Sequence, residues 1–181
     1  MKKLLIFIHG AGDEGYEADA ELVASLRQTL GEEYEVRYPK LTTDESRSDF
    51  GWPEQIQTQL DAMEEEFVLV GHSLGASFIL KCLSERTIKK AIRGVFLIAA
   101  PFWAGEEDWK QGLKLQEGFA SRLPVNVPVF LYHSRDDEEV PFSHLETYAQ
   151  KLPHATVREV EKGGHQLNND LSLIAADIKS L

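Results

Sequence analysis

The sequence predicts an α/β fold in three α/β/α layers, with helices on both faces of a doubly wound, six-stranded, mainly parallel sheet. Two observations predict it. Short apolar runs alternate with helical patterns along all 181 residues, which is typical of strands joined by crossover helices. No internal repeat, low-complexity tract or linker interrupts the alternation. At about 100–200 residues per domain, we therefore expect residues 1–181 to form a single domain.

Six short segments carry the strand signals. Four are almost continuously apolar, as expected of strands buried on both faces of a parallel sheet: Leu4–Ile8, Phe67–Val70, Val95–Ala99 and Val129–Tyr132. Two alternate between apolar and polar residues, and we place them nearer the edges: Tyr34–Tyr38 and Thr156–Val160. Sheets of this kind place their sites beyond the carboxyl ends of the strands. The residues that follow each strand are therefore the ones to examine for chemistry.

Helical patterns lie between these strands. Each places apolar residues on one face: Leu22, Val23, Leu26 and Leu30; Ile56, Leu60 and Met63; Phe78, Ile79, Cys82 and Leu83; Leu145, Tyr148, Ala149 and Leu152; Leu171, Ile174, Ile178 and Leu181. Gly31 is a C-terminal stop signal for the first helix, and Pro53 suits the first turn of the second. Ser143 and Glu146 have the spacing of a capping box, so we expect Ser143 to cap its helix.

The charge balance excludes several classes of partner. With 19 Lys and Arg against 30 Asp and Glu, the formal net charge is −11, and so acidic a surface repels nucleic-acid phosphates and anionic lipids. No apolar stretch approaches the ~20 residues of a membrane span, and the run Leu4–Ile8 is shorter than the ~7–15 residues of a signal-peptide core. The single cysteine, Cys82, fits a reducing compartment. We expect a cytoplasmic protein that binds neither nucleic acid nor membranes.

The loop after the third predicted strand carries the strongest chemical signal. Gly71-His72-Ser73-Leu74-Gly75 matches G-x-S-x-G and lies between a strand and a helix, which is the context that a nucleophile elbow requires. The turn lifts the Ser73 hydroxyl off the sheet, and side chains at positions 71 and 75 would clash, which explains the two glycines. The start of the helix aims backbone N–H groups at a developing oxyanion. Ser73 is therefore the candidate nucleophile.

A serine nucleophile needs a base, and the base needs an acid that orients it. His165 follows the sixth predicted strand, after Gly163 and Gly164, and an acidic run of residues 136–139 follows the fifth. The order serine, acid, histidine is therefore available, and geometry alone leaves the choice between Asp136 and Asp137 open. The acidic run lacks the spacing of a calcium loop, so we expect no metal there.

The remaining histidines have structural interpretations. We expect His9 to shape its loop without a titrating role, and His72 to pack beside the elbow. The other three are expected to be capping or surface residues: His133, His144 and His154.

The glycine loop after the first predicted strand has two interpretations. Residues 10–15 match G-x-G-x-x-G between a strand and a helix, which is also the pattern of a dinucleotide-binding fingerprint. Asp13 and Glu14 would repel a pyrophosphate, and no acidic residue is placed to bind a ribose. We favour the alternative, in which the backbone N–H of Ala11 lies beside that of Leu74 and completes an oxyanion hole.

Taken together, these segments resemble the α/β-hydrolase superfamily, and within it the small serine hydrolases related to retinoblastoma-binding protein 9. The resemblance rests on HGAG at 9–12, Trp52-Pro53, GHSLG at 71–75, DDEEVP at 136–141 and GGH at 163–165. In this superfamily the acid commonly stands three residues before a Val-Pro or similar pair, which favours Asp137. The resemblance implies a minimal α/β-hydrolase fold without a cap domain, since only residues 101–128 are available for one.

The resemblance also implies an activity. We expect hydrolysis of a carboxylic ester or thioester with a small uncharged acyl group, by Ser73, His165 and Asp137 and without metal or organic cofactor. Trp103 and Phe142 are the candidate substrate contacts. The alternative function is a protein-interaction module that retains an idle hydrolase site, because the resemblance also implies association with a protein partner.

Overall fold

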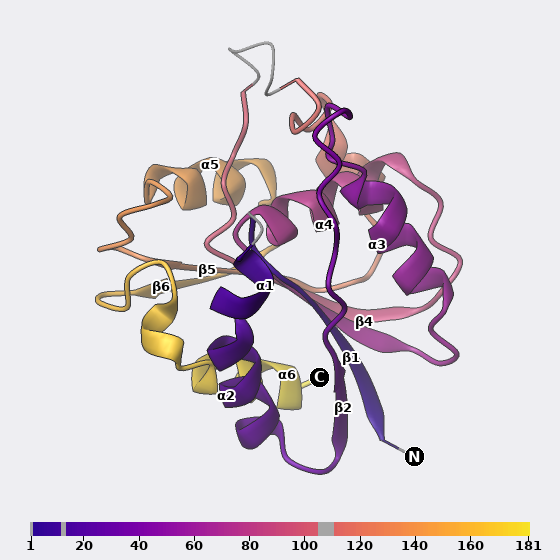
Figure 1. The fold of residues 1–181 in the computed structure, drawn as a ribbon. Helices are drawn as coiled ribbons and strands as arrows, with labels where there is room; N and C mark the ends of the chain where they lie inside the picture. The colour runs from indigo at the N-terminus through magenta and orange to yellow at the C-terminus, as the bar shows by residue number, and fades with distance from the viewer. Residues whose placement is uncertain (1, 12–13, 105–110) are drawn as a thin grey trace.

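A six-stranded, all-parallel sheet lies at the centre of the structure (Figure 1). The computed structural model describes residues 2–11, 14–104 and 111–181. In chain order the strands are β1 (Lys3–Ile8), β2 (Tyr34–Arg37), β3 (Phe67–His72), β4 (Ile92–Ile98), β5 (Val129–Ser134) and β6 (Thr156–Val160). Their spatial order is β2-β1-β3-β4-β5-β6. The predicted fold class is confirmed.

The burial of each strand follows its place in the sheet. All six residues of β3, which lies between β1 and β4, are buried. The edge strand β6 exposes its three central residues, because it has a hydrogen-bonded neighbour on one side only. The prediction that the continuously apolar runs are central and the alternating runs are edges is confirmed.

Helices cover both faces of the sheet (Figure 1). One face carries α1 (Gly15–Ala18), α2 (Ala20–Leu30) and α6 (Ser172–Lys179), with the short 3-10 helix η3 (Leu167–Asn169). The other carries α3 (Trp52–Asp61), α4 (Leu74–Glu85) and α5 (Ser143–Lys151), with the 3-10 helix η2 (Phe119–Arg122). Within the described residues, none of the helices combines the length and the apolar composition that crossing a bilayer requires.

Alternate residues of the strands feed two separate cores. Ile6 and Ile8 of β1 pack with α3, α4 and α5, whereas Leu5 and Phe7 pack with α2 and α6. The two-residue period of a strand sends successive side chains to opposite faces, so a strand covered on both faces must be apolar throughout. Because all neighbouring strands are parallel, their carboxyl ends and the loops that follow them lie at the same edge of the sheet.

The helix ends confirm two predictions and correct one. Gly31 ends α2 with a φ of 75°, and Pro53 lies in the first turn of α3. Ser143, by contrast, is the first residue of α5 and makes no capping hydrogen bond; Phe142 precedes the helix with helical dihedral angles. The capping-box prediction is wrong because Pro141 already begins the turn: its carbonyl accepts the His144 N–H, so Ser143 is helical rather than extended.

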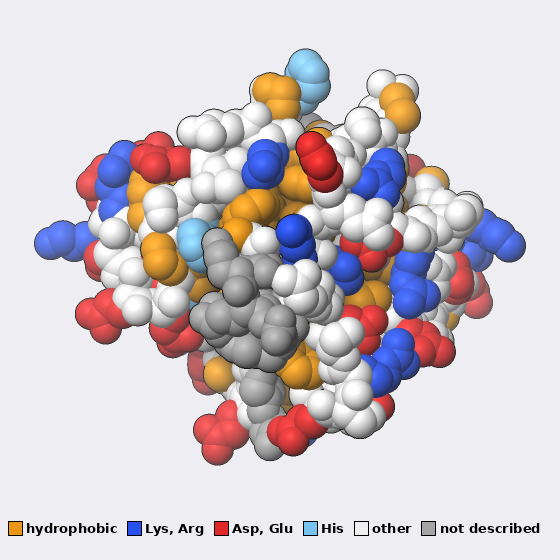
Figure 2. Space-filling model, turned by 90° about the horizontal axis from the view of Figure 1, so that it is seen from above, with side chains coloured by type: hydrophobic (Ala, Val, Ile, Leu, Met, Phe, Trp, Pro, Cys, Tyr) orange, Lys and Arg blue, Asp and Glu red, His pale blue; other side chains and the backbone are white. Residues whose placement is uncertain are grey.

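The described part of the connection between β4 and β5 contains little helical structure. Its described residues contain η2, which packs against α4, and no cap domain is present among them. Residues 105–110, which include Trp109, lie outside the described part of the chain. Figure 2 looks onto the face that carries α3, α4 and α5 and shows charged and apolar side chains interspersed there.

Candidate active site

Ser73 occupies a strained turn between β3 and α4. Its φ of 52° and ψ of −126° are rare for a residue with a side chain, and its N–H donates to the Ile98 carbonyl at 2.8 Å. A Cβ on Gly71 would lie 2.6 Å from Ile79 Cδ1, and one on Gly75 would lie 2.3 Å from the His9 carbonyl oxygen. The predicted reason for both glycines is therefore confirmed: the turn brings backbone and side chains too close for a Cβ.

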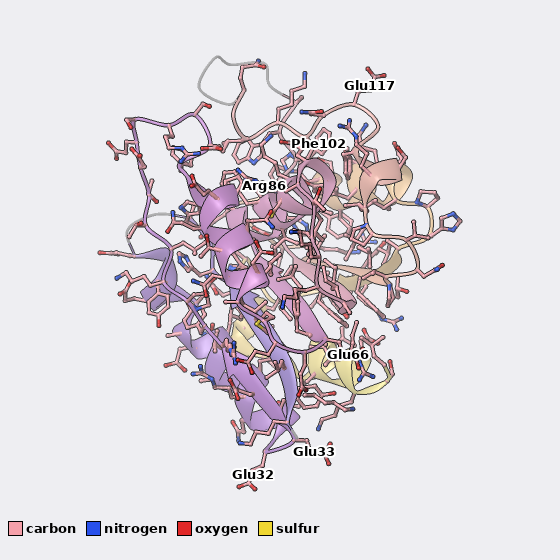
Figure 3. All side chains as sticks on the ribbon, turned by 90° about the vertical axis from the view of Figure 1, so that its right-hand side faces the viewer. Glu32, Glu33, Glu66, Arg86, Phe102 and Glu117 are labelled. Atoms are coloured by element: carbon pink, nitrogen blue, oxygen red, sulfur yellow. The ribbon has the colours of Figure 1, made fainter. Side chains whose placement is uncertain are left out.

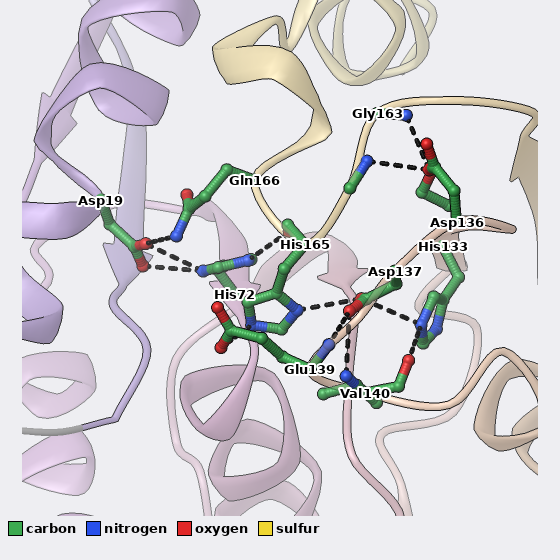
Figure 4. A network of polar contacts seen from close by, with 12 residues as sticks. Asp19, His72, His133, Asp136, Asp137, Glu139, Val140, Gly163, His165 and Gln166 are labelled. Atoms are coloured by element: carbon green, nitrogen blue, oxygen red, sulfur yellow. Dashed lines mark hydrogen bonds and ion pairs between the residues drawn. The ribbon is translucent and has the colours of Figure 1, made fainter.

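His165 and Asp137 form a hydrogen-bonded pair (Figure 4). The distance between His165 Nδ1 and Asp137 Oδ2 is 2.9 Å, and the Asp137 carboxylate is 0% exposed. Its Oδ1 accepts the backbone N–H groups of Glu139 and Val140, each at 2.9 Å. Burial alone would raise the pKa of Asp137, but these amides and His165 outweigh it and lower the pKa. The carboxylate therefore stays ionised and accepts a hydrogen bond from the Nδ1–H of His165.

His133 is a further neighbour of the same carboxylate. Its Nε2 lies 3.1 Å from Asp137 Oδ2 and 2.9 Å from the Val140 carbonyl oxygen. Burial lowers the pKa of His133, so a neutral ring shares its Nε2 proton between the two acceptors. The expectation of a capping or surface role is wrong, because β5 extends through residue 134 and buries this side chain.

The other two histidines in that expectation differ from each other. His144 is half-buried and its Nδ1 accepts the N–H of Phe102 at 3.0 Å, a loop contact rather than a cap. His154 is exposed, as predicted.

Asp136 has a different role from its neighbour. Its Oδ1 accepts the N–H groups of Gly163 and Gly164, each at 2.9 Å, as well as the Ser134 hydroxyl. Ser134 and then these two amides lower the pKa of Asp136 to about 2. Gly164 has a φ of 60°, which a glycine adopts without strain. Asp136 therefore holds the backbone of the loop on which His165 lies, and Asp137 holds the imidazole.

The loop after β1 lies against the nucleophile turn. A Cβ on Gly10 would lie 3.3 Å from Ser73 Cβ. His9 is buried; its Nδ1 lies 2.7 Å from the Gly10 carbonyl oxygen and its Nε2 accepts the Leu41 N–H at 2.9 Å. Because the C=O and N–H of a trans peptide point in opposite directions, holding the Gly10 carbonyl also fixes the direction of the Ala11 N–H.

The charge state of His9 agrees with this arrangement. One ring nitrogen faces an acceptor and the other a donor, which a neutral imidazole satisfies completely. Burial lowers the pKa of His9, in the same direction. The expectation that His9 shapes its loop is confirmed. Gly12 and Asp13, part of the predicted glycine loop, lie outside the described residues.

A second histidine–carboxylate pair lies behind the first. His72 Nδ1 is 2.9 Å from both carboxylate oxygens of Asp19, and each side chain is 1% exposed. Asp19 also accepts the N–H of Gly10 at 2.8 Å and the side-chain amide of Gln166 at 3.2 Å. His72 packs beside the elbow as expected. Asp19 and Gln166 carry no motif, so sequence reasoning had no signal for either residue.

Two hollows lie near the carboxyl ends of the strands. One, of about 440 Å³, borders His165 and has the acidic side chains of Asp136, Glu138 and Glu139 on its wall. The carboxylate of Glu139 is 3.6 Å from His165 Nε2 and 71% exposed. The acidic loop therefore borders the site, as the sequence predicts.

The second hollow, of about 480 Å³, has a mixed lining of aromatic and charged residues, among them Phe102, Trp103, Phe119, Lys114 and Lys151. Figure 3 places Phe102 and Glu117 at the top of the molecule, on the side of the sheet shown in Figure 2. None of Ser73, Asp137 and His165 lines it. Phe142 lies elsewhere: its ring contacts the His133 ring edge-on, with centroids 5.7 Å apart, and Arg135 lies over its face. The structure thus does not bring Trp103 and Phe142 into one hollow with His165.

Comparisons with known proteins identify the fold and the family of the chain. The putative hydrolase YdeN of Bacillus subtilis (strain 168) is 28% identical over 128 residues, which cover 66% of this chain and 63% of that relative. The crystal structure of the ydeN gene product from B. subtilis has a TM-score of 0.74 at 22% identity, over 99% of this chain and 98% of that one. Est1E from Butyrivibrio proteoclasticus has a TM-score of 0.73 at 17% identity, over 99% and 86%. These likenesses confirm the expected α/β-hydrolase fold. A family model described as serine hydrolase matches residues 14–172, and the chain therefore belongs to the serine hydrolase family.

Proposed function

We propose that the protein hydrolyses carboxylic esters or thioesters of small uncharged acyl groups, with Ser73 as nucleophile, His165 as base and Asp137 as the orienting acid. The observation that carries the proposal is the 2.9 Å contact between His165 Nδ1 and the buried Asp137 carboxylate. It leaves Nε2 as the only ring nitrogen that can take the Ser73 proton. Membership of the serine hydrolase family supports the same assignment.

The proposed reaction proceeds in two halves. Ser73 Oγ attacks the carbonyl carbon while His165 Nε2 takes its proton, and the tetrahedral intermediate collapses when His165 returns that proton to the leaving alcohol or thiol. Water then attacks the acyl-Ser73 ester, again losing a proton to His165, and the carboxylic acid leaves as Ser73 recovers its proton. Asp137 stays ionised throughout and stabilises the imidazolium. No metal or organic cofactor takes part in this proposed sequence.

The oxyanion is assigned to two backbone amides. Leu74 is the first residue of α4, so helix geometry leaves its N–H without an intrahelical acceptor. The direction of the Ala11 N–H is fixed through the Gly10 carbonyl. Each such donor is worth about 2.7–4 kcal/mol to the transition state. The proposal therefore assigns two amides from segments that meet at Ser73.

The surroundings of His165 support one part of the proposed substrate class, the exclusion of anionic groups. The acidic wall of the neighbouring hollow disfavours anionic acyl groups, and we keep small neutral esters as the proposed substrates. Trp103 and Phe142 remain proposed substrate contacts, because they follow the carboxyl ends of β4 and β5, on the side of the sheet where the proposed site lies. A cytoplasmic location is part of the same proposal and agrees with a single, buried, free Cys82.

A fluorophosphonate probe tests the proposal directly. We expect the folded protein to be labelled once, at Ser73, and Ser73→Ala to remain unlabelled. Ser143→Ala is the matched control, because Ser143 is exposed on the first turn of α5, and it should label as the wild type does. Absence of labelling on folded protein, or equal labelling of Ser73→Ala, would refute the proposed activity and favour a protein-interaction module with an idle site.

A further inference from the structure

The proposed reaction makes no use of the buried pair formed by Asp19 and His72. Asp19 lies between α1 and α2, and His72 is the last residue of β3, directly before Ser73. Both side chains are 1% exposed. A fully buried carboxylate and imidazole are costly to remove from water unless each is paired. Their contacts therefore indicate what the pair does.

Both ring nitrogens of His72 face hydrogen-bond acceptors. Nδ1 is 2.9 Å from the Asp19 carboxylate, and Nε2 is 3.0 Å from the backbone carbonyl oxygen of His165 (Figure 4). A neutral imidazole has only one N–H, so beside an ionised Asp19 a neutral His72 could make only one of these two hydrogen bonds. The doubly protonated cation makes both. With Asp19 ionised, the geometry therefore favours an imidazolium facing a carboxylate.

The charged groups around His72 favour the same state. Burial alone would lower its pKa, but the hydrogen bond to and the charge of Asp19, the His165 carbonyl and the charge of Asp137 outweigh burial and raise the pKa. For Asp19, burial raises the pKa, yet the contacts with His72 and the Gly10 amide lower it overall. The other ring packed against His72 is that of His165, with centroids 4.7 Å apart. Each partner therefore holds the other in its charged form.

The pair joins three segments that are far apart in the chain. Asp19 accepts the N–H of Gly10, in the loop after β1, at 2.8 Å. It also accepts the side-chain amide of Gln166, next to His165, at 3.2 Å. His72 directly precedes Ser73 in the turn between β3 and α4, and its Nε2 contacts the His165 carbonyl. One buried ion pair thus connects the loop assigned to the oxyanion, the serine and the base.

We propose that Asp19 and a doubly protonated His72 are positioning residues, which fix the His165 loop and the Gly10–Ala11 peptide relative to Ser73. This inference rests on the proposed hydrolase function for its kinetic consequence, but not for its structural one. Without the charge, His72 loses one of its two contacts and no longer holds the His165 carbonyl and Asp19 at the same time. A displacement of about 1 Å in such a constellation costs on the order of 10²-fold in rate.

The first test reads the charge state without any activity. In long-range ¹H–¹⁵N NMR spectra of the wild type at pH 8, well above the ordinary histidine value of about 6.5, we expect His72 to show two protonated ring nitrogens. We expect Asp19→Asn to convert His72 to a neutral ring and to shift the His165 ring signals. A neutral His72 in the wild type at pH 8 would overturn the proposal, whether or not the protein hydrolyses esters.

The second test separates positioning from packing by kinetics. For a short-chain aryl ester, we expect Asp19→Asn to lower kcat by on the order of 10²-fold with little change in KM. Glu21→Gln, an exposed carboxylate-to-amide change on α2, is the matched control and should retain wild-type kcat. An unchanged kcat in folded Asp19→Asn would overturn the positioning role. Lack of activity in the wild type would instead refute the proposed function, and the NMR test would still decide the inference.

Two substitutions of His72 keep the test decisive if Asp19→Asn folds poorly. Glutamine can place an amide donor near the position of Nε2, and asparagine near that of Nδ1. Because the Nε2 contact holds the His165 carbonyl, we expect His72→Gln to retain at least tenfold more kcat than His72→Asn. Equal losses in the two variants would point to packing alone and overturn the proposal.

Discussion

Replacing Asp137 with asparagine should remove most of the activity because of the direction in which the new amide must point. Asp137 Oδ1 accepts two backbone N–H groups, from Glu139 and Val140. In the variant, the amide oxygen must take that position, since an NH₂ group there would face two donors. The NH₂ group then faces His165 Nδ1 and His133 Nε2. His165 can accept it only as the tautomer protonated on Nε2, which cannot take the Ser73 proton.

The size of the effect follows from this tautomer change. A triad histidine held in the wrong tautomer loses about 10⁴-fold in kcat, and we expect a loss of 10³–10⁴-fold for Asp137→Asn, or about 4–5.5 kcal/mol of transition-state stabilisation. Asp136→Asn is the matched control: Asp136 is exposed and holds loop amides through one oxygen, which an asparagine oxygen can replace. We expect it to lose less than tenfold.

The assay is steady-state hydrolysis of a short-chain aryl ester by wild type, Asp137→Asn and Asp136→Asn, with circular dichroism melting to confirm that each is folded. A larger loss in Asp136→Asn than in Asp137→Asn would move the acid by one residue and refute the reasoning. A loss below tenfold in folded Asp137→Asn would show that the His165 tautomer does not depend on this carboxylate.

Four further outcomes are expected. The lowered pKa of Asp19 gives stability that is present above about pH 4 and lost as pH falls through the folded value; the raised pKa of His72 gives stability that is complete below about pH 6.5 and lost as pH rises. The melting temperature should therefore fall both at low pH and at high pH. If its fall at high pH were the same in Asp19→Asn as in the wild type, this reasoning would be contradicted. Glu139→Gln should reduce the preference for a cationic over a neutral ester by roughly 1.4- to 5-fold, as for an exposed ion pair worth about 0.2–1 kcal/mol; equal ratios in the two proteins would count against an electrostatic role. Gly75→Ala places a Cβ 2.3 Å from a backbone carbonyl oxygen and should lower the free energy of unfolding by about 1–3 kcal/mol, measured by denaturant titration, where an unchanged midpoint would contradict the close approach. Trp103→Ala should alter acyl-chain preference in an ester series, and an unchanged profile would end its proposed substrate role.

The strands and the nucleophile turn could be predicted because their signals are local. A strand covered on both faces is apolar at successive positions, as in β1 and β3, and the elbow needs its glycines two residues on either side of Ser73. The proposed base could be predicted from chain order, since His165 lies in the loop after the sixth strand. Chain order leaves the proposed acid open between Asp136 and Asp137, and the family resemblance favours Asp137. These features depend on neighbours within a few residues, so a short stretch of sequence is enough to predict them.

The residues that sequence reasoning missed depend on contacts between distant segments. Asp19 is one of 30 acidic residues, and its partners Gly10, His72 and Gln166 are 9, 53 and 147 residues away. His133 looked like a surface residue because the predicted strand ended at Tyr132, one residue before it. A buried charge is recognisable only when its partners are known, and three-dimensional packing supplies those partners.

The hydrogen-bond partners of the buried histidines distinguish the proposed base from its neighbours. His9 faces one acceptor and one donor, so it is satisfied as a neutral ring and has no proton to gain. His72 faces two acceptors, so it is satisfied as a cation and has no lone pair to offer. His165 has an acceptor at Nδ1 only, while its Nε2 faces the hollow beside an exposed carboxylate. Of these three rings, His165 alone has the free lone pair that general-base catalysis needs, and the other two hold the segments around it.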